Sequence, residues 1–438
     1  MTAPAYTTNG DGMYASRKSV GSEGAPPPQI PGHRNRFPTF RALQHRDFRL
    51  LWIGLAVSAV GTWMQIVAQS LLVLDLTHGS PTALGTVSLA QALAFLVFAP
   101  VGGTAADRFH RRRLLLLTQS IMMVMALLLG VLTATRAIRF WMIPFLACAS
   151  SATLGFDQPA RNAFIASLVP RENLMNAIAL QSAVFNGASI LGPALAGLTL
   201  NRIGYAGNFF FNTASYLAVL LALLALRTPP TPGVPRPGGG WIDSIREAFQ
   251  YVRRDAVLSS MVPAHATLLF FGPSAALMLP LFARQVLDAG AAQLGVLFSA
   301  VGVGTVLGAL IIASLGDFSH KGRLVFASIL LWSVALTGFG LTTSLYLSLL
   351  ALFALGAAQN AAGATTTTLL QMRVPPEMRG RAMSLNTLLI MCVRPLGDFP
   401  VAAAMGRVGF RPTVVLSALV VGVATFTLFV ARPGARSA

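Results

Sequence analysis

Two oppositely charged residues lie inside one of the apolar segments of the chain. Arg394 and Asp398 are one helical turn apart near the middle of the segment 381–406. On insertion scales, a charge at the centre of a membrane-spanning helix costs about 2.5–3.5 kcal/mol, so a charge found there usually serves binding or transport. Two interpretations are open: Arg394 binds an anionic group while Asp398 takes up and releases a proton, or the two charges neutralise each other beside a water-filled cavity.

A second group of charges lies in the short stretch 102–113, between two apolar segments. Gly103 precedes Asp107 by one helical turn, and glycine on a membrane helix allows another helix to approach closely. A carboxylate at such a helix end can also accept hydrogen bonds from the N-terminus of a second helix. We interpret the stretch as a gate, and the alternative is that its charges only set the membrane topology. The candidate gate residues, with their counterparts in the second half of the chain, are Gly103, Asp107, Arg108, Arg111, Arg113, Asp317 and Arg323.

Other polar residues inside the apolar segments give weaker signals. Asp157 and Arg161 are spaced to share one helix face, although Pro159 between them argues against a regular helix, and an exposed pair of little energetic value is the alternative. Asp75 is a candidate proton site, but a carboxylate at the membrane interface is also ordinary. His265 is isolated and is expected to be satisfied structurally. The amides that can line a cavity or hold helices together are Gln65, Gln69, Gln91, Gln181, Asn186, Gln359, Asn360 and Asn386.

Composition and hydropathy predict the elements that carry these residues. Of 438 residues, 54% are apolar and only 11% are charged, whereas soluble domains carry about 25% charged residues. Twelve apolar segments are each long enough to cross about 30 Å of hydrocarbon as a helix. They are residues 50–75, 84–104, 114–135, 140–160, 174–200, 207–226, 257–283, 293–315, 324–343, 345–370, 381–406 and 412–431. The sequence therefore predicts an all-α integral membrane protein with twelve transmembrane helices in a lipid bilayer.

The net charge of +18 is distributed unevenly along the chain. Most basic residues lie in the N-terminal tail and in alternate loops, such as those around 108–113, 161–171 and 373–381. Loops rich in Lys and Arg stay in the cytoplasm, so we expect both termini there. Because the charge follows the membrane loops, it does not indicate nucleic-acid binding. The two cysteines, Cys148 and Cys392, lie in apolar segments and predict neither a disulfide framework nor a metal site.

The two halves of the chain repeat each other. Residues 84–114 align without a gap on 294–324, and Gly192 aligns with Gly397 further along. Parallel repeats of six spans are one plan of membrane transporters, with the substrate bound between the halves. Within the linker between the halves, Trp241–Arg254 is expected to be an amphipathic helix on the membrane surface or a plain connector packed on the bundle. The predicted domains are a disordered cytoplasmic tail (1–45), a six-helix bundle (46–226), the linker (227–256), a second six-helix bundle (257–432) and a short cytoplasmic tail (433–438).

Four phrases of the sequence point to a known family. They are Phe48-Arg49-Leu50-Leu51-Trp52, Gly61-Thr62-Trp63-Met64-Gln65, Asp157-Gln158-Pro159-Ala160-Arg161 and Leu191-Gly192-Pro193-Ala194-Leu195-Ala196-Gly197. In these phrases the chain resembles a twelve-span transporter of the major facilitator superfamily, over about residues 40–430. The resemblance is to the exporter branch that includes enterobactin exporters and macrolide or tetracycline efflux proteins.

The resemblance implies roles for several of these residues. The stretch 102–113 resembles the superfamily's loop motif, and its Asp107 is expected to contact the N-terminus of the eleventh span, near Arg379–Met383. Both copies of the loop depart from the family pattern, because His110 and His320 stand where glycine is usual. By the same resemblance, Asp157 and Arg161 are candidates for a charge network with the loop arginines. The candidates for the antiporter motif of the fifth span are Gly187, Gly192, Pro193 and Gly197.

From these residues and this resemblance we expect a secondary active transporter, a proton-coupled exporter of drug-like or siderophore-like small molecules in the cytoplasmic membrane. We expect it to work as a monomer by rocking of two pseudo-symmetric six-helix bundles, with no cofactor and no metal. An importer or a lysolipid flippase on the same fold is the first alternative. A membrane-embedded enzyme is the second, but it would need clustered His, Cys or carboxylate side chains that the sequence does not supply.

Overall fold

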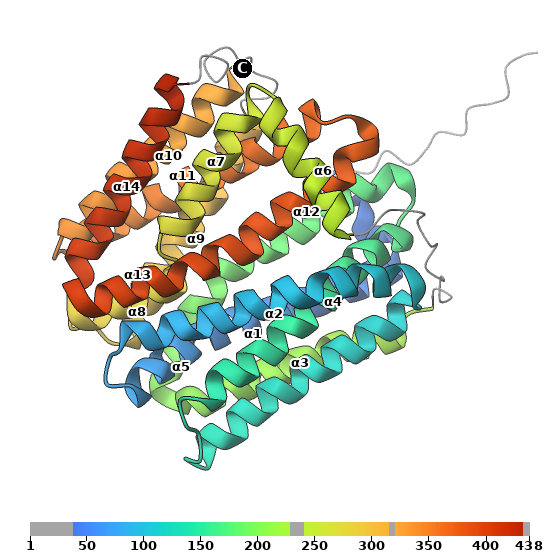
Figure 1. Cartoon of the computed structure of the whole chain (residues 1–438). Coiled ribbons are helices and arrows are strands. Elements are labelled where there is room, and N and C mark those ends of the chain that lie inside the picture. The colour runs from blue at the N-terminus through green and yellow to red at the C-terminus, as the bar shows by residue number, and fades with distance from the viewer. Residues whose placement is uncertain (1–37, 228–240, 315–319, 432–438) are drawn as a thin grey trace, which may run out of the picture. The chain divides into compact units, whose positions relative to one another are not determined.

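The structure is a computed structural model that describes residues 38–227, 241–314 and 320–431. These residues form helices and no strand (Figure 1). The α-helices are α1 (Arg46–Leu76), α2 (Pro81–Arg108), α3 (Arg111–Ala134), α4 (Met142–Leu168), α5 (Leu174–Ala225), α6 (Trp241–Arg254), α7 (Leu258–Phe271), α8 (Ala275–Gln285), α9 (Ala291–Ser314), α10 (Lys321–Leu341), α11 (Leu345–Arg373), α12 (Arg379–Leu388), α13 (Arg394–Val408) and α14 (Phe410–Ala431). Four short helices join them: the 3-10 helices η1 (Pro38–Gln44), η2 (Arg171–Asn173) and η3 (Pro376–Met378), and the π-helix η4 (Leu389–Val393).

The number of membrane crossings agrees with the predicted twelve. Ten helical stretches are long and apolar enough to span a bilayer. One of them, Arg171–Ala225, has 55 residues, about 80 Å of helix against about 30 Å of hydrocarbon. It is two crossings, because Gly204 interrupts α5 with a φ of 65°. Helix α4, with 27 residues, is long enough for the twelfth crossing.

Two predicted spans are interrupted in the structure. The span expected over 257–283 is broken between α7 and α8, because Pro273 lacks an N–H for the helix and the Ser274 side chain begins α8 by accepting from the Leu277 N–H at 3.2 Å. The span expected over 381–406 contains the π-turn of η4 directly before Arg394. Pro159, by contrast, lies inside the continuous α4, against the expectation of an irregular helix there.

The ends of the predicted domains change as well. Residues 38–44 were expected in a disordered tail, but they form η1, in which Ala42 is buried and its N–H donates to the Asn176 side chain at 2.9 Å. The remaining tail residues, the start of the linker and the C-terminal tail lie outside the described residues. The helix expected at Trp241–Arg254 is present as α6.

The repeat in the sequence appears as matched contacts in the two halves. Gly85 of α2 packs against the Phe399 and Ala402 region of α13, and its counterpart Gly295 of α9 packs against the Pro193 carbonyl of α5. Figure 1 shows α13 lying along α2. We call the α2–α13 and α5–α9 contacts the two seams, because they join the first half of the chain to the second. An apolar cluster that draws on both halves surrounds them.

Glycine also sets the packing within each half. A side chain on Gly192 of α5 would come within 2.4 Å of Trp63 Cβ on α1, and one on Gly397 of α13 within 1.9 Å of the Phe270 carbonyl oxygen on α7. Each of these glycines therefore allows close backbone approach, as small residues do in membrane bundles. The two copies of the repeat thus place the same glycine in the same type of contact.

The helix ends gather at two ends of the molecule. We call the end that carries the α2–α3 loop, η2, η3 and α6 the basic face, since the loop arginines lie there. We call the end that carries the α1–α2 and α8–α9 loops the far end. At the far end, Gly204 and Gly409 begin the sixth and twelfth spans with φ values of 65° and 99°. Residues with a side chain rarely adopt these values.

Gly192 and Gly187 offer a matched test of this packing. Gly192→Ala should destabilise the protein by about 1–3 kcal/mol, because its Cβ would press on Trp63 and on the Val60 carbonyl. Gly187→Ala on the same helix should be neutral or stabilising by up to about 1 kcal/mol, because no atom lies within 4 Å of the new Cβ. Thermal unfolding of the two purified variants measures the difference, and equal shifts would contradict this packing.

Candidate functional site

Asp398 is a buried carboxylate at the seam between α2 and α13. Its side chain is 2% exposed, and Oδ1 accepts a hydrogen bond from the Ser274 N–H at 2.8 Å. Ser274 begins α8, so the carboxylate lies at the positive end of a helix dipole, which favours an anion. The hydroxyl group of Ser88, on α2 in the other half, lies beside it. Groups from both halves of the protein thus hold one carboxylate.

Arg394 lies one turn before Asp398 but does not neutralise it by direct contact. Within 38–227, 241–314 and 320–431, the guanidinium forms no ion pair, and its buried Nη2 has no hydrogen-bonding partner. The interpretation of Arg394 and Asp398 as a mutually neutralising pair is therefore not observed. Asp398 is instead satisfied by the break in the seventh span, which leaves Arg394 available to another group.

Asp75 takes part in a contact between the halves at the far end. It forms an ion pair with Arg284 at the end of α8 and accepts a hydrogen bond from the Tyr205 hydroxyl. Asp75 was expected to be an ordinary carboxylate at the membrane interface. In the structure it forms an ion pair that joins α1 to α8. The side chains are 35% and 40% exposed, so the ion pair contributes about 1 kcal/mol or less. Arg284 and Tyr205 were not among the residues predicted from the sequence. The only indication of their role there is that both lie at span ends on the same side as Asp75.

At the basic face, the expected contact of Asp107 is not formed. In the part of the chain that the structure describes, no residue donates a hydrogen bond to Asp107 or pairs with it. Arg111 instead donates to the Ala163 carbonyl at 3.3 Å and Arg112 to the Leu224 carbonyl at 3.1 Å. Both arginines therefore interact with the C-terminal ends of helices, where a cation is favourable.

The remaining gate candidates have different surroundings. Arg108 and Arg113 are exposed, and Arg323 lies exposed in the first turn of α10. Asp317 lies outside the described residues. His110 has a φ of −59°, so this turn does not require the glycine that the family usually has there.

Gly103 does not mark the close approach that was expected of it. A side chain at Gly103 would meet no atom within 4 Å, whereas one at Gly102 would come within 2.2 Å of the Gly155 carbonyl oxygen on α4. The neighbouring glycine therefore forms the α2–α4 contact. In the fifth span, Gly197 contacts the Ala291 carbonyl of α9 across the seam, while Gly187 has open space.

Asp157 and Arg161 form a buried ion pair on α4. Asp157 is 0% exposed and pairs with Arg161, while its Oδ1 accepts hydrogen bonds from Thr118 and Gln119 of α3, each at 2.8 Å. The alternative of an exposed, weak pair is wrong. The carboxylate ties α3 to α4, and none of its hydrogen-bond donors is a loop arginine.

Three of the amides expected to line a cavity or to hold helices together, Gln65, Gln69 and Gln91, differ in their contacts. Gln65 Oε1 accepts a hydrogen bond from Asn212 Nδ2 at 2.6 Å, so it joins α1 to α5. Gln69 and Gln91 are half-buried, and at Gln91 the backbone carbonyl accepts from the Ser151 hydroxyl at 2.7 Å. Gln65 therefore holds helices together, which was one of the two roles expected of these amides.

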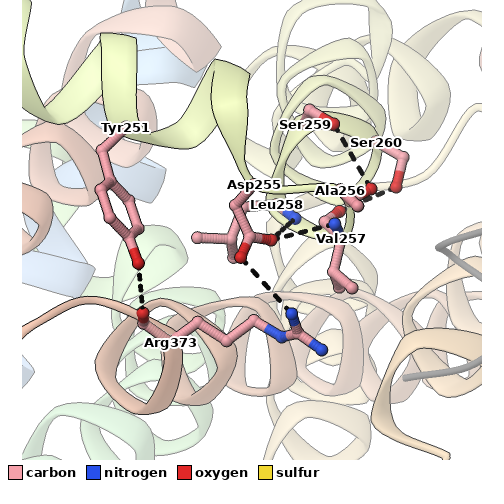
Figure 2. A network of polar contacts seen from close by, with 8 residues as sticks. All are labelled: Tyr251, Asp255, Ala256, Val257, Leu258, Ser259, Ser260 and Arg373. Atoms are coloured by element: carbon pink, nitrogen blue, oxygen red, sulfur yellow. Dashed lines mark hydrogen bonds and ion pairs between the residues drawn. The ribbon is translucent and has the colours of Figure 1, made fainter.

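Helix α6 is fastened to the basic end of the second half. Figure 2 shows the Tyr251 hydroxyl donating to the Arg373 carbonyl at 2.7 Å and Asp255 pairing with the Arg373 guanidinium at 3.4 Å. Glu247 pairs with Arg381 of α12. The same face of α6 buries Ala248 beside α12. Of the two alternatives for this helix, the structure therefore agrees with a connector packed on the bundle. Through Arg381, α6 contacts the first turn of α12, the end of the eleventh span that Asp107 was expected to reach.

A twelve-span helical bundle of two repeated halves, with charged side chains between them, defines a membrane transporter of the major facilitator fold. The chain belongs to the transmembrane secretion effector family, whose profile matches residues 38–432. This confirms the resemblance to the major facilitator superfamily. No three His, Cys, Asp or Glu side chains of the described residues gather as a metal site requires.

Known proteins agree with this assignment. The enterobactin exporter EntS of Shigella flexneri is 28% identical over 376 residues, 85% of this chain and 88% of the relative. EntS of Citrobacter koseri is 28% identical over 380 residues, covering 86% and 89%. Among solved structures, a POT family transporter in complex with 5-aminolevulinic acid has a TM-score of 0.74 at 13% identity, covering 89% and 96%. A D-xylose–proton symporter has a TM-score of 0.69 at 14% identity, covering 90% and 99%.

Asp157→Ala should lower the free energy of unfolding by about 3 kcal/mol, because it leaves Arg161, Thr118 and Gln119 without their common acceptor. The control is Glu247→Gln, whose ion pair is half-exposed and should contribute about 1 kcal/mol or less. Thermal unfolding of both variants in one detergent compares them. A smaller effect at Asp157 than at Glu247 would show that the buried pair does not stabilise the first half.

Proposed function

We propose that this transporter exports a small molecule from the cytoplasm in exchange for protons, by alternating access as a monomer in the cytoplasmic membrane. The observation that carries the proposal is Asp398, a buried carboxylate that contacts Ser274 in its own half and Ser88 in the other. A proton bound there changes contacts on both sides of a seam. The basic face would be cytoplasmic, because the loop arginines lie on it, and we expect both termini on the cytoplasmic side.

We interpret the present arrangement as open toward the basic face. The contacts that support this are the Asp75–Arg284 ion pair at the far end and the seam at Gly85 near the same end of α2. At the basic face Asp107 has no partner among the described residues. In the opposite state the far-end pair would break, and Asp107 would accept hydrogen bonds from the N-terminus of α12. Each state would then have its own set of contacts, as two-state transport requires.

Protonation gives this exchange a physical cause. Ionised Asp398 accepts the Ser274 N–H strongly, since hydrogen bonds to charged groups contribute about 1.5–3 kcal/mol. A protonated Asp398 carboxyl would bind the Ser274 N–H, between α7 and α8, and the Ser88 hydroxyl of α2 less strongly. The two halves would then be freer to rotate against each other while a proton is bound.

The relatives support the proposed direction and substrate class. The curated relatives in two genera are enterobactin exporters, which supports export of a siderophore-like or drug-like molecule by this chain. The fold does not set the direction, because proton symporters share it. Import and lysolipid flipping on this fold are therefore distinguished from export by the direction of transport and by the molecule transported. A vesicle assay measures both.

The test is transport by the purified protein in lipid vesicles with an imposed pH gradient. Labelled enterobactin and a panel of drugs should move in the direction opposite to the flow of protons. Asp398→Asn should reduce this gradient-driven flux to that of protein-free vesicles. Asp243→Asn, on the exposed side of α6, is the matched control and should transport normally. Unchanged gradient-driven flux in Asp398→Asn would remove the role of this carboxylate, and movement along the proton gradient would indicate import.

A further inference from the structure

Three helices of the second half carry buried nitrogen atoms that lack a hydrogen-bonding partner among the described residues. Among the described residues, His265 Nδ1 on α7, Asn360 Nδ2 on α11 and Arg394 Nη2 on α13 are buried and have no hydrogen-bonding partner. His265 is only 2% exposed. Its isolation in sequence suggested a histidine satisfied by the structure, and that expectation is wrong. A buried polar atom without a partner is costly, so it calls for a partner such as a ligand, an ion or a bound water.

The three groups lie at one level of the second half. Asn386 donates to Thr367 at 3.1 Å, which sets the register of α12 against the antiparallel α11. Counted along both helices from this pair, Asn360 and Arg394 lie at a similar depth, with the π-turn η4 between Asn386 and Arg394. The chain therefore brings an amide donor and a guanidinium to a similar depth from two helices of the second half.

His265 joins them from the third helix. Its ring atoms Cε1 and Nε2 lie 3.7 Å from the position that a Cβ on Gly363 would occupy, and Gly363 is one turn from Asn360 on the same face of α11. The ring is also close enough to Arg394 for their charges to interact. The absence of a side chain at Gly363 leaves the ring beside α11.

No carboxylate of the described residues forms a direct ion pair with the charge of this cluster. Arg394 makes no ion pair within the described chain, and the carboxylate one turn away, Asp398, is already bound by the Ser274 N–H. An unpaired guanidinium inside the membrane is expensive. The π-turn η4 ends directly before Arg394, and such turns are frequent at functional sites. Both features are expected of a residue that waits for a ligand.

We propose that His265, Asn360 and Arg394 form a binding site for an anionic group of the transported molecule, a carboxylate or a similar planar oxyanion. A guanidinium matches two oxygens of a carboxylate in a bidentate pair, and the histidine and amide nitrogens supply further donors. The inference rests on the proposed transport function, since it names the chemical class of its substrate. Asp398, bound separately, remains available for the proton.

The test compares an acid with its neutral ester. The full-length protein in phosphatidylcholine nanodiscs, which carry no anionic lipid, is dialysed against 2-naphthoate or methyl 2-naphthoate. Wild type should bind the acid and not the ester. Arg394→Gln should weaken binding of the acid by about tenfold or more, Asn360→Ala should weaken it less, and Arg394→Lys should retain part of it. The control Arg253→Gln, on α6, should bind as wild type does.

A stability measurement separates binding from folding. Arg394→Gln removes an unpaired buried charge, so its thermal unfolding midpoint should stay equal or rise. 2-Naphthoate should raise the midpoint of wild type and of Arg253→Gln, and leave that of Arg394→Gln unchanged. Equal binding of acid and ester, no saturable binding of the acid up to about 10 mM, or full affinity in Arg394→Gln would overturn the site. If Arg394→Gln does not fold, unchanged affinity in Asn360→Ala overturns it.

The vesicle assay distinguishes this failure from failure of the proposed function. Gradient-driven flux of neutral or cationic molecules, together with equal binding of acid and ester, would remove the anion site and leave proton-coupled transport in place. Selective binding of the acid without any gradient-driven flux would leave the site in place and remove the transport mechanism.

Discussion

The buried carboxylate of Asp398 is the constraint on which the arrangement of the two halves depends. An ionised group inside a membrane protein must be hydrogen-bonded, because its burial otherwise costs several kcal/mol. The chain meets this need by breaking its seventh span, so that the first N–H of α8 donates to the carboxylate. The first half contributes Ser88 from α2. A single ionisable group thereby connects the interior of one half to the surface of the other.

The seams around this group include close approaches of the backbone at glycine. Gly85 and Gly295 occupy equivalent positions in the repeat, and each allows a helix of one half to approach a helix of the other. Because protein interiors are close-packed, the proposed mechanism would move each half as a body and would not deform it continuously. Rotation about the seams would open one end while it closes the other. The Asp75–Arg284 pair at the far end fits one extreme of that motion, and so does Asp107 at the basic face, which has no partner among the described residues.

Much of the fold could be predicted because a membrane imposes simple rules. Apolar segments of membrane length predicted the spans, and the repeat predicted the pairing of the halves. Arg394 and Asp398 were found because charge is rare in such segments. The contacts of these residues could not be predicted, since they join helices far apart in sequence: Asp75 and Arg284 are 209 positions apart. The break at Gly272-Pro273-Ser274 did have a local signal, because Gly-Pro is a strong helix breaker, but an apolar average over the span conceals it.

The central claim, that protonation of one carboxylate between the halves drives their rocking, is tested most directly by paired distances. Spin labels at Thr104 and Ser384 report on the basic face, and labels at His78 and Asp288 report on the far end; all four positions are exposed. As the pH falls, the two distances in the wild type should change in opposite directions, and in the Asp398→Asn background both should become independent of pH. Distances that change in the same direction, or that keep their pH dependence without the carboxylate, would contradict the account.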